Sequence, residues 1–97
     1  MRELIVDGQA MTSKSAMYTH LSRVFEFPDH FGKNLDALWD TLTDETEPTV
    51  IYVKHVAKLI EQMDGYGEKL IQVFQKLEQS TENYTVHFYP DEKIEEK

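Results

Sequence analysis

Three aspartates spaced four residues apart are the side chains of this sequence with the clearest potential for chemistry. At that spacing Asp36, Asp40 and Asp44 fall on one side of a helix, and we call them the acidic row. Neighbouring carboxylates can act as an acid and a base, or they can receive a cation. Like charges at this spacing destabilise an isolated helix by roughly 0.2–0.5 kcal/mol per pair. The acidic row therefore indicates that a cation arrives from outside the helix.

Catalysis is the less favoured interpretation of the acidic row. Acid–base pairs usually come from different elements across a cleft, where different environments separate the two pKa values. Two carboxylates on one exposed helix face lack that difference. The sequence also contains no glycine-rich phosphate loop, no Ser-His-Asp arrangement and no nucleophile elbow. We therefore expect a binding protein rather than an enzyme.

Neither a metal nor a cofactor is expected from the sequence. The histidines are scattered through the chain, at His20, His30, His55 and His87. None lies three or four residues from another, which is the spacing of a metal-binding pair on a helix. The chain has no cysteine, and this excludes disulfides, thiolate metal sites and thiol catalysis.

The net charge of −8 is concentrated in two segments. Residues 29–47 hold six acids and one lysine, and residues 91–97 hold four acids and two lysines. A dense negative patch attracts a basic partner and repels nucleic acid. A solvated acidic face that only improves solubility is the alternative that charge by itself leaves open.

The acidic row needs a helix to present it, and the apolar residues between the aspartates predict one. Leucines recur there at helical spacing, at Leu35, Leu38 and Leu42. Asn34 is expected to cap the N-terminus of this helix. Trp39 is a core candidate that could also form the edge of a binding surface. Thr43 could satisfy the end of the helix or offer its hydroxyl group to a partner.

The rest of the chain alternates strand and helix patterns, which predicts an α/β fold. Apolar and β-branched runs indicate three strands, at residues 4–6, 49–53 and 84–89. Amphipathic patterns indicate four helices, between residues 13 and 27, 34 and 48, 56 and 63, and 67 and 80. Helical crossovers imply a parallel sheet with right-handed connections. We expect the first strand to be buried and the second to be central.

These elements form one expected domain over residues 1–90, followed by a charged tail at residues 91–97. The first apolar run is too short for a secretory signal. No run approaches the roughly 20 apolar residues that span a bilayer. The expected location is the cytoplasm, with no membrane contact.

One stretch of the sequence resembles a known family. The run from Phe27 to Asp40, FPDHFGKNLDALWD, is similar to the signature of the barstar family of bacterial ribonuclease inhibitors, and Gly32–Asp40 is its most specific part. Weaker similarity continues to about Tyr89. The resemblance implies a small three-stranded parallel sheet packed with about four helices, which agrees with the elements predicted above.

The resemblance also implies a function. Barstar-like proteins bind barnase-like secreted ribonucleases inside the cell that makes them and block the active site. The chain would then form a one-to-one complex with a basic ribonuclease. The family's binding helix and its preceding loop map onto His30, Gly32, Asn34, Asp36, Trp39, Asp40 and Thr43. Asp40 matches the aspartate that enters the phosphate pocket of the nuclease.

Three departures from the family pattern affect the expected partner. His30 stands where the inhibitor has a tyrosine, and Asp44–Glu45 replaces a glycine and a tryptophan in a segment one residue shorter. Lys76 occupies the place of a partner-binding glutamate. We therefore include Asp44 and Lys76 in the expected partner-binding set. We expect the partner to be a related nuclease with a different rim around its active site. The alternative is an acidic interaction module of the same fold with a partner that is not a nuclease.

Overall fold

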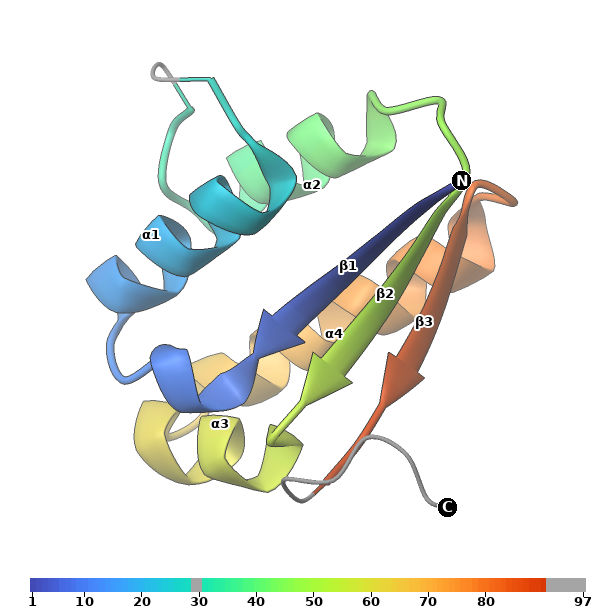
Figure 1. The fold of residues 1–97 in the computed structure, drawn as a ribbon. Coiled ribbons are helices and arrows are strands. Elements are labelled where there is room, and N and C mark those ends of the chain that lie inside the picture. The colour runs from blue at the N-terminus through green and yellow to red at the C-terminus, as the bar shows by residue number, and fades with distance from the viewer. Residues whose placement is uncertain (29–30, 91–97) are drawn as a thin grey trace.

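Within its described residues, the chain folds into three parallel strands and four α-helices, with two of these helices between each strand and the next (Figure 1). The computed structural model describes residues 1–28 and 31–90. Its strands are β1 (Arg2–Asp7), β2 (Thr49–Lys54) and β3 (Tyr84–Phe88). Its helices are α1 (Lys14–Phe25), α2 (Leu35–Thr43), α3 (Val56–Met63) and α4 (Tyr66–Ser80), with a short 3-10 helix η1 (Gly8–Ala10) that the sequence did not predict. The sheet order is β1-β2-β3, so the predicted fold class and the central position of β2 are confirmed. The predicted tail lies outside the described residues.

One face of the sheet packs against helices and the other is open. Along β2, Ile51 and Val53 are buried while Tyr52 between them is partly exposed. Figure 1 shows α4 crossing behind the sheet, with no helix of the described residues in front of it. The expectation of a buried first strand is wrong, because β1 lies at the sheet edge and alternates its side chains between the two faces. Ile5 points to the open face and is 49% exposed.

The core lies between the sheet and the helices. Its fully buried side chains include Met17, Leu21, Leu38, Leu42 and Phe74. Leu38 and Leu42 of α2 therefore face inward, as their spacing predicted, whereas Leu35 in the first turn is only half-buried. The side of the helix that bears the acidic row is left to solvent. Burying a large apolar side chain stabilises a fold by roughly 1.5–3 kcal/mol, so this inward face is what holds α2 in place.

Helix α1 begins where the sequence predicted and ends slightly earlier. The Ser13 hydroxyl oxygen accepts a hydrogen bond from the Ala16 N–H at 3.1 Å, which makes Ser13 the N-cap. The helix ends at Phe25 because Glu26 turns into the left-handed region, with φ 59°. Phe27 then stacks on Phe25, with ring centroids 5.4 Å apart. These two rings form one side of a hollow described below.

Helix α4 begins earlier than predicted, because Tyr66 and Gly67 are helical rather than part of a turn. Gly67 is buried where α4 approaches α3. A Cβ atom at this position would lie 2.7 Å from the backbone oxygen of Leu59. This glycine therefore allows close packing of two helices, and a larger residue would force them apart.

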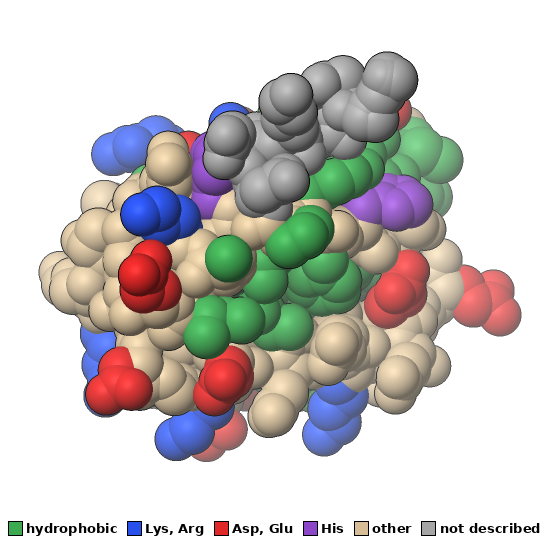
Figure 2. Space-filling view, turned by 90° about the horizontal axis from the view of Figure 1, so that it is seen from below, with side chains coloured by type: hydrophobic (Ala, Val, Ile, Leu, Met, Phe, Trp, Pro, Cys, Tyr) green, Lys and Arg blue, Asp and Glu red, His purple; other side chains and the backbone are tan. Residues whose placement is uncertain are grey.

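Helix α3 has the predicted bounds, and not all of its apolar side chains are buried. Leu59 and Met63 are buried, whereas Ile60 is 36% exposed. The lower end of the molecule in Figure 1 is occupied by α3, and Figure 2 views that end. Hydrophobic side chains gather there between acidic and basic ones.

Two histidines and an aspartate meet where β1 and β2 end. The Asp7 N–H donates a hydrogen bond to His20 Nε2 at 2.9 Å, and Asp7 Oδ1 lies 2.8 Å from His55 Nδ1. Burial by itself would raise the pKa of Asp7, but hydrogen bonds from Gln9 and His55 outweigh it and lower that pKa. Burial lowers the pKa of His20 below its ordinary 6.5, because it disfavours the charged imidazolium form. The hydrogen bond that His20 Nε2 accepts from the Asp7 N–H likewise requires this nitrogen to be unprotonated.

We expect the stability of the protein to fall in mild acid because of His20. The folded protein resists protonation of this histidine more than the unfolded chain does, so the free energy of unfolding decreases as pH drops below about 6.5. The decrease levels off once pH passes below the folded-state pKa. Urea unfolding should be measured from about pH 8 to about pH 5 for the parent and for His20→Gln, which can still accept the hydrogen bond without titrating. Equal pH dependence in the two proteins would contradict this assignment.

Candidate partner-binding site

The site is built on α2, which is held firmly at both ends. At its N-terminus the Asn34 side-chain oxygen accepts a hydrogen bond from the Ala37 N–H at 2.8 Å, which confirms the predicted cap. At its C-terminus the buried Tyr84 hydroxyl donates to the Leu42 carbonyl at 2.7 Å. Burial raises the pKa of Tyr84 to about 12, so this hydroxyl remains a donor over the whole neutral range. Side-chain hydrogen bonds thus anchor both ends of α2 to their surroundings.

Acidic residues crowd the C-terminal end of α2, where they oppose the helix dipole. Asp44 forms the C-cap and is exposed, and the last turn contains no basic residue. A negative charge at this end typically costs 0.3–1 kcal/mol. Thr43 satisfies the helix end as expected, since its hydroxyl donates to the Trp39 carbonyl at 2.8 Å. The same hydroxyl oxygen can still accept a hydrogen bond from a partner.

The acidic row is not neutralised within the described part of the chain. The ion pairs there join Arg2 to Glu45 at 3.5 Å and Lys58 to Glu61 at 3.7 Å, and His55 Nδ1 lies 2.8 Å from Asp7 Oδ1. None of them reaches a member of the acidic row, and all three members are exposed. Arg2 thus compensates Glu45, while the acidic row remains available to cations from outside.

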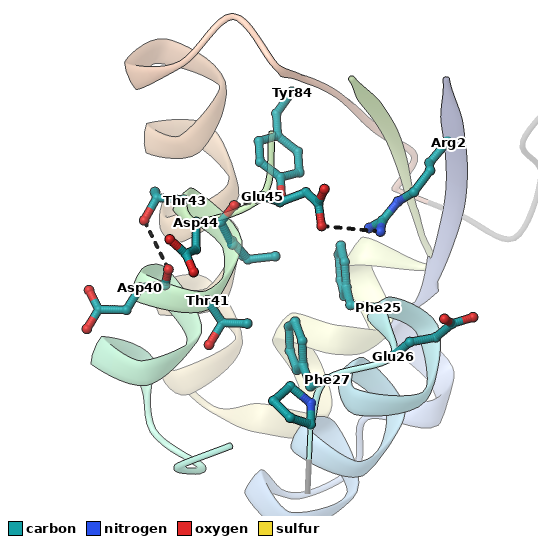
Figure 3. Close-up of a pocket in the computed structure, with 12 residues that line it drawn as sticks. Arg2, Phe25, Glu26, Phe27, Asp40, Thr41, Thr43, Asp44, Glu45 and Tyr84 are labelled. Atoms are coloured by element: carbon teal, nitrogen blue, oxygen red, sulfur yellow. Dashed lines mark hydrogen bonds and ion pairs between the residues drawn. The ribbon is translucent and has the colours of Figure 1, made fainter. Parts of the chain in front are cut away.

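A hollow of about 690 Å³ lies beside the C-terminal end of α2, and we call it the C-terminal hollow (Figure 3). Its lining residues come from α1 and the loop after it, from α2 and the loop after it, and from two strands: Arg2, Phe25, Glu26, Phe27, Pro28, Asp40, Thr41, Leu42, Thr43, Asp44, Glu45 and Tyr84. Figure 3 shows the Phe25 and Phe27 rings across from α2, with Asp40 directed outward at the edge. The hollow thus combines an aromatic wall with an acidic rim.

A second hollow, of about 650 Å³, lies on the other flank of α2, and we call it the α2–α4 hollow. It is lined by Leu35, Asp36, Trp39 and Asp40 of α2 and by Lys69, Gln72, Val73 and Lys76 of α4. Lys76 Nζ lies 5.3 Å from the centre of the half-buried Trp39 ring. Trp39 therefore contributes to the core edge and to the surface at once, as its sequence context suggested.

Asp40 borders both hollows, so it lies on the ridge between them. The other expected site residues divide around it. Asp36, Trp39 and Lys76 line the α2–α4 hollow, while Thr43 and Asp44 line the C-terminal hollow.

The remaining expected residues line neither hollow. Gly32 and Asn34 are exposed near the N-terminus of α2. A Cβ atom on Gly32 would meet Ala37 Cβ at 3.6 Å, an ordinary contact, so the fold does not demand glycine there. His30 lies outside the described residues.

Sequence reasoning missed the α4 residues that form the second wall of the α2–α4 hollow. Lys69, Gln72 and Val73 join Lys76 there. Counted from Lys69, the other three residues lie three, four and seven positions further along, which places all four on one face of the helix. This pattern could have been read from the sequence. What the pattern could not reveal is that this face meets α2.

Two further properties bear on the class of protein. Among residues 1–28 and 31–90, no three histidine, aspartate or glutamate side chains gather as ligands for a metal ion. No helix in the same ranges is long and apolar enough to cross a membrane. The fold and site define a small acidic α/β protein with a helix that is hydrogen-bonded at both ends and whose outer carboxylates face solvent.

Comparison with known proteins identifies the family. The family model described as Barstar (barnase inhibitor) matches residues 1–90, and the chain therefore belongs to the barstar family. A protein of Bacillus subtilis (strain 168) named "Putative ribonuclease inhibitor YrdF" is 30% identical over 80 residues, which cover 81% of this chain and 88% of that protein.

Proposed function

We propose that this chain inhibits a basic, barnase-like ribonuclease by covering its active site in a one-to-one complex. The observation that carries the proposal is the position of Asp40, an exposed carboxylate on α2 with a hollow on either side. No ion pair within the described residues engages it. Membership of the barstar family and the name of the Bacillus relative support a ribonuclease as the class of partner.

The proposed mechanism is mimicry of substrate charge without chemistry. A ribonuclease collects cationic side chains around the phosphate that it cleaves, and a carboxylate can occupy the same anion site through charge-assisted hydrogen bonds. Asp40 would take that position, with Asp36 one turn away as its neighbour. Because Asn34 and Tyr84 already hold α2, little ordering would be needed on binding. The chain would act on its partner without catalysing a reaction, inside the cell that makes the nuclease.

The proposed contact surface is larger than Asp40 alone. It comprises Asp36, Trp39, Asp40, Thr43, Asp44 and Lys76, with Gly32, His30 and Asn34 toward the start of α2. The central carboxylates would supply most of the attraction, and the hollows on either side of them would admit side chains from the rim of the nuclease.

The function can be tested by capture followed by inhibition. The tagged chain is used to capture proteins from the cells that produce it, and the captured protein is assayed for cleavage of RNA. We expect a ribonuclease whose activity falls linearly as the chain is added and reaches zero at one chain per enzyme. A captured partner that has no nuclease activity, and no catalytic cleft, would instead favour the acidic interaction module.

We expect association with the ribonuclease to slow steeply as salt concentration rises. The acidic row is exposed, and exposed charges are screened beyond about 8 Å at physiological ionic strength. Stopped-flow measurement from about 0.05 to about 0.5 M salt should show a falling association rate and a smaller change in dissociation rate. A flat association profile would remove electrostatic steering from the mechanism.

A further inference from the structure

The α2–α4 hollow carries opposite charges on its two walls. The α2 wall bears Asp36 and Asp40, and the α4 wall bears Lys69 and Lys76. Between them lies an apolar floor of half-buried side chains: Leu35, Trp39 and Val73. A space of about 650 Å³ between such walls is large enough to admit a side chain from a partner.

The α4 wall is positive because its acidic residues lie elsewhere. None of the α4 residues that line the hollow is acidic, and the other polar one is Gln72. Glu78 Oε2 accepts a hydrogen bond from the Val86 N–H at 3.0 Å, so its side chain is engaged at β3. A cationic side chain of a partner is therefore attracted by α2 and repelled by α4.

The charges of the two walls do not cancel each other. No ion pair of the described residues crosses the hollow, although the walls have opposite signs. Lys76 instead places Nζ 5.3 Å from the centre of the Trp39 ring, where the negative face of the ring attracts the ammonium group. This contact restrains a long side chain at the hollow and leaves its three N–H donors able to bind an anion.

We propose that the α2–α4 hollow receives an acidic side chain from the rim of the ribonuclease, whose carboxylate is bound by Lys76 with support from Lys69. The basic residues of the same enzyme would meet Asp36 and Asp40 on the opposite wall. A ribonuclease whose rim is entirely basic would place like charges against α4 and be rejected. Lys76 is thus a specificity-determining residue, and this inference rests on the proposed function.

The test uses a substitution for which local and overall electrostatics predict opposite results. Lys76→Glu makes a chain of net charge −8 still more acidic, so attraction to a basic enzyme would increase if overall charge decided binding. If Lys76 contacts a carboxylate, the same change creates repulsion and weakens binding. Lys58→Glu is the matched control, because it changes the charge equally on α3, at the lower end of the molecule in Figure 1.

Two ribonucleases serve as probes: barnase, and the ribonuclease that the parent chain captures from its own cells. Dissociation constants are measured for the parent, Lys76→Glu, Lys76→Gln and Lys58→Glu, after thermal unfolding has confirmed that each variant is folded. We expect Lys76→Glu to weaken binding of the captured enzyme by about tenfold or more and Lys76→Gln by less. Lys76→Glu should not weaken the binding of barnase to the same extent. Lys58→Glu should leave the ratio of the dissociation constants for the two enzymes unchanged.

If Lys76→Glu binds the captured enzyme as tightly as the parent does, or more tightly, the inference is overturned and the proposed function stays intact. A charge swap gives the second readout. Replacing the carboxylates on the rim of the captured enzyme with lysine, one at a time, should restore tight binding of Lys76→Glu at one position. If no replacement restores it, Lys76 does not bind a partner carboxylate. If no ribonuclease is captured at all, the proposed function fails and the inference fails with it.

Discussion

Asp40→Ala should weaken inhibition of the ribonuclease by about 30-fold to a few thousand-fold and leave the fold intact. In the complex Asp40 would be surrounded by cationic groups, and removing it leaves those groups buried without a partner, at a typical cost of 2–5 kcal/mol. In the free protein its side chain is exposed and fills no part of the core. Stability should therefore change by less than about 0.5 kcal/mol. Inhibition titrations and thermal unfolding on the same preparation measure the two effects.

Two further substitutions calibrate the result for Asp40. Asp36→Ala removes a neighbouring charge on the same helix face and should cost less inhibition. Glu3→Ala removes an equal charge from an exposed position on β1 and should cost almost none. If Asp40→Ala inhibits as well as the parent, or no worse than Glu3→Ala, then Asp40 does not occupy the phosphate pocket.

Leu38→Ala should produce the opposite pattern, because Leu38 lies on the inward face of the same helix. Its side chain is 0% exposed. Replacing a fully buried leucine with alanine removes apolar contacts and leaves a cavity, which typically costs 2–5 kcal/mol of stability. For a chain of this size each kcal/mol lowers the melting temperature by roughly 4–8 °C. Urea unfolding should show this loss, while the fraction that stays folded should still inhibit at one chain per enzyme.

Leu38→Met is the matched control for the core, since it nearly conserves volume and should cost less than about 1.5 kcal/mol. A stability loss below about 1 kcal/mol for Leu38→Ala would mean that α2 is not anchored by its buried face. Equal loss of inhibition by the folded fractions of Leu38→Ala and Asp40→Ala would also contradict the division of α2 into a structural and a binding face.

Local periodicity in the amino-acid sequence is enough to predict several features of this protein. The spacing of Leu38 and Leu42 assigns them to the buried side of α2, and the spacing of Asp36 and Asp40 assigns them to the exposed side. The cap at Asn34 was likewise predictable, because its side-chain hydrogen bond spans only three residues. Alternation of strand and helix patterns indicated the parallel sheet before any distance was known.

Which faces of different elements meet depends on tertiary packing and could not be predicted from the sequence. Along the chain, Lys76 is separated from Trp39 by the end of α2, all of β2 and α3, and most of α4. Nothing in the pattern of either helix states that the lysine lies over the ring or that a hollow separates the walls. The same holds for Gly67, whose need for glycine arises from the backbone of α3, and for Ile5, which is exposed because no helix of the described residues covers that sheet face. Helix and strand periods specify which side of an element is apolar, whereas the relative placement of elements depends on how all the apolar sides pack together.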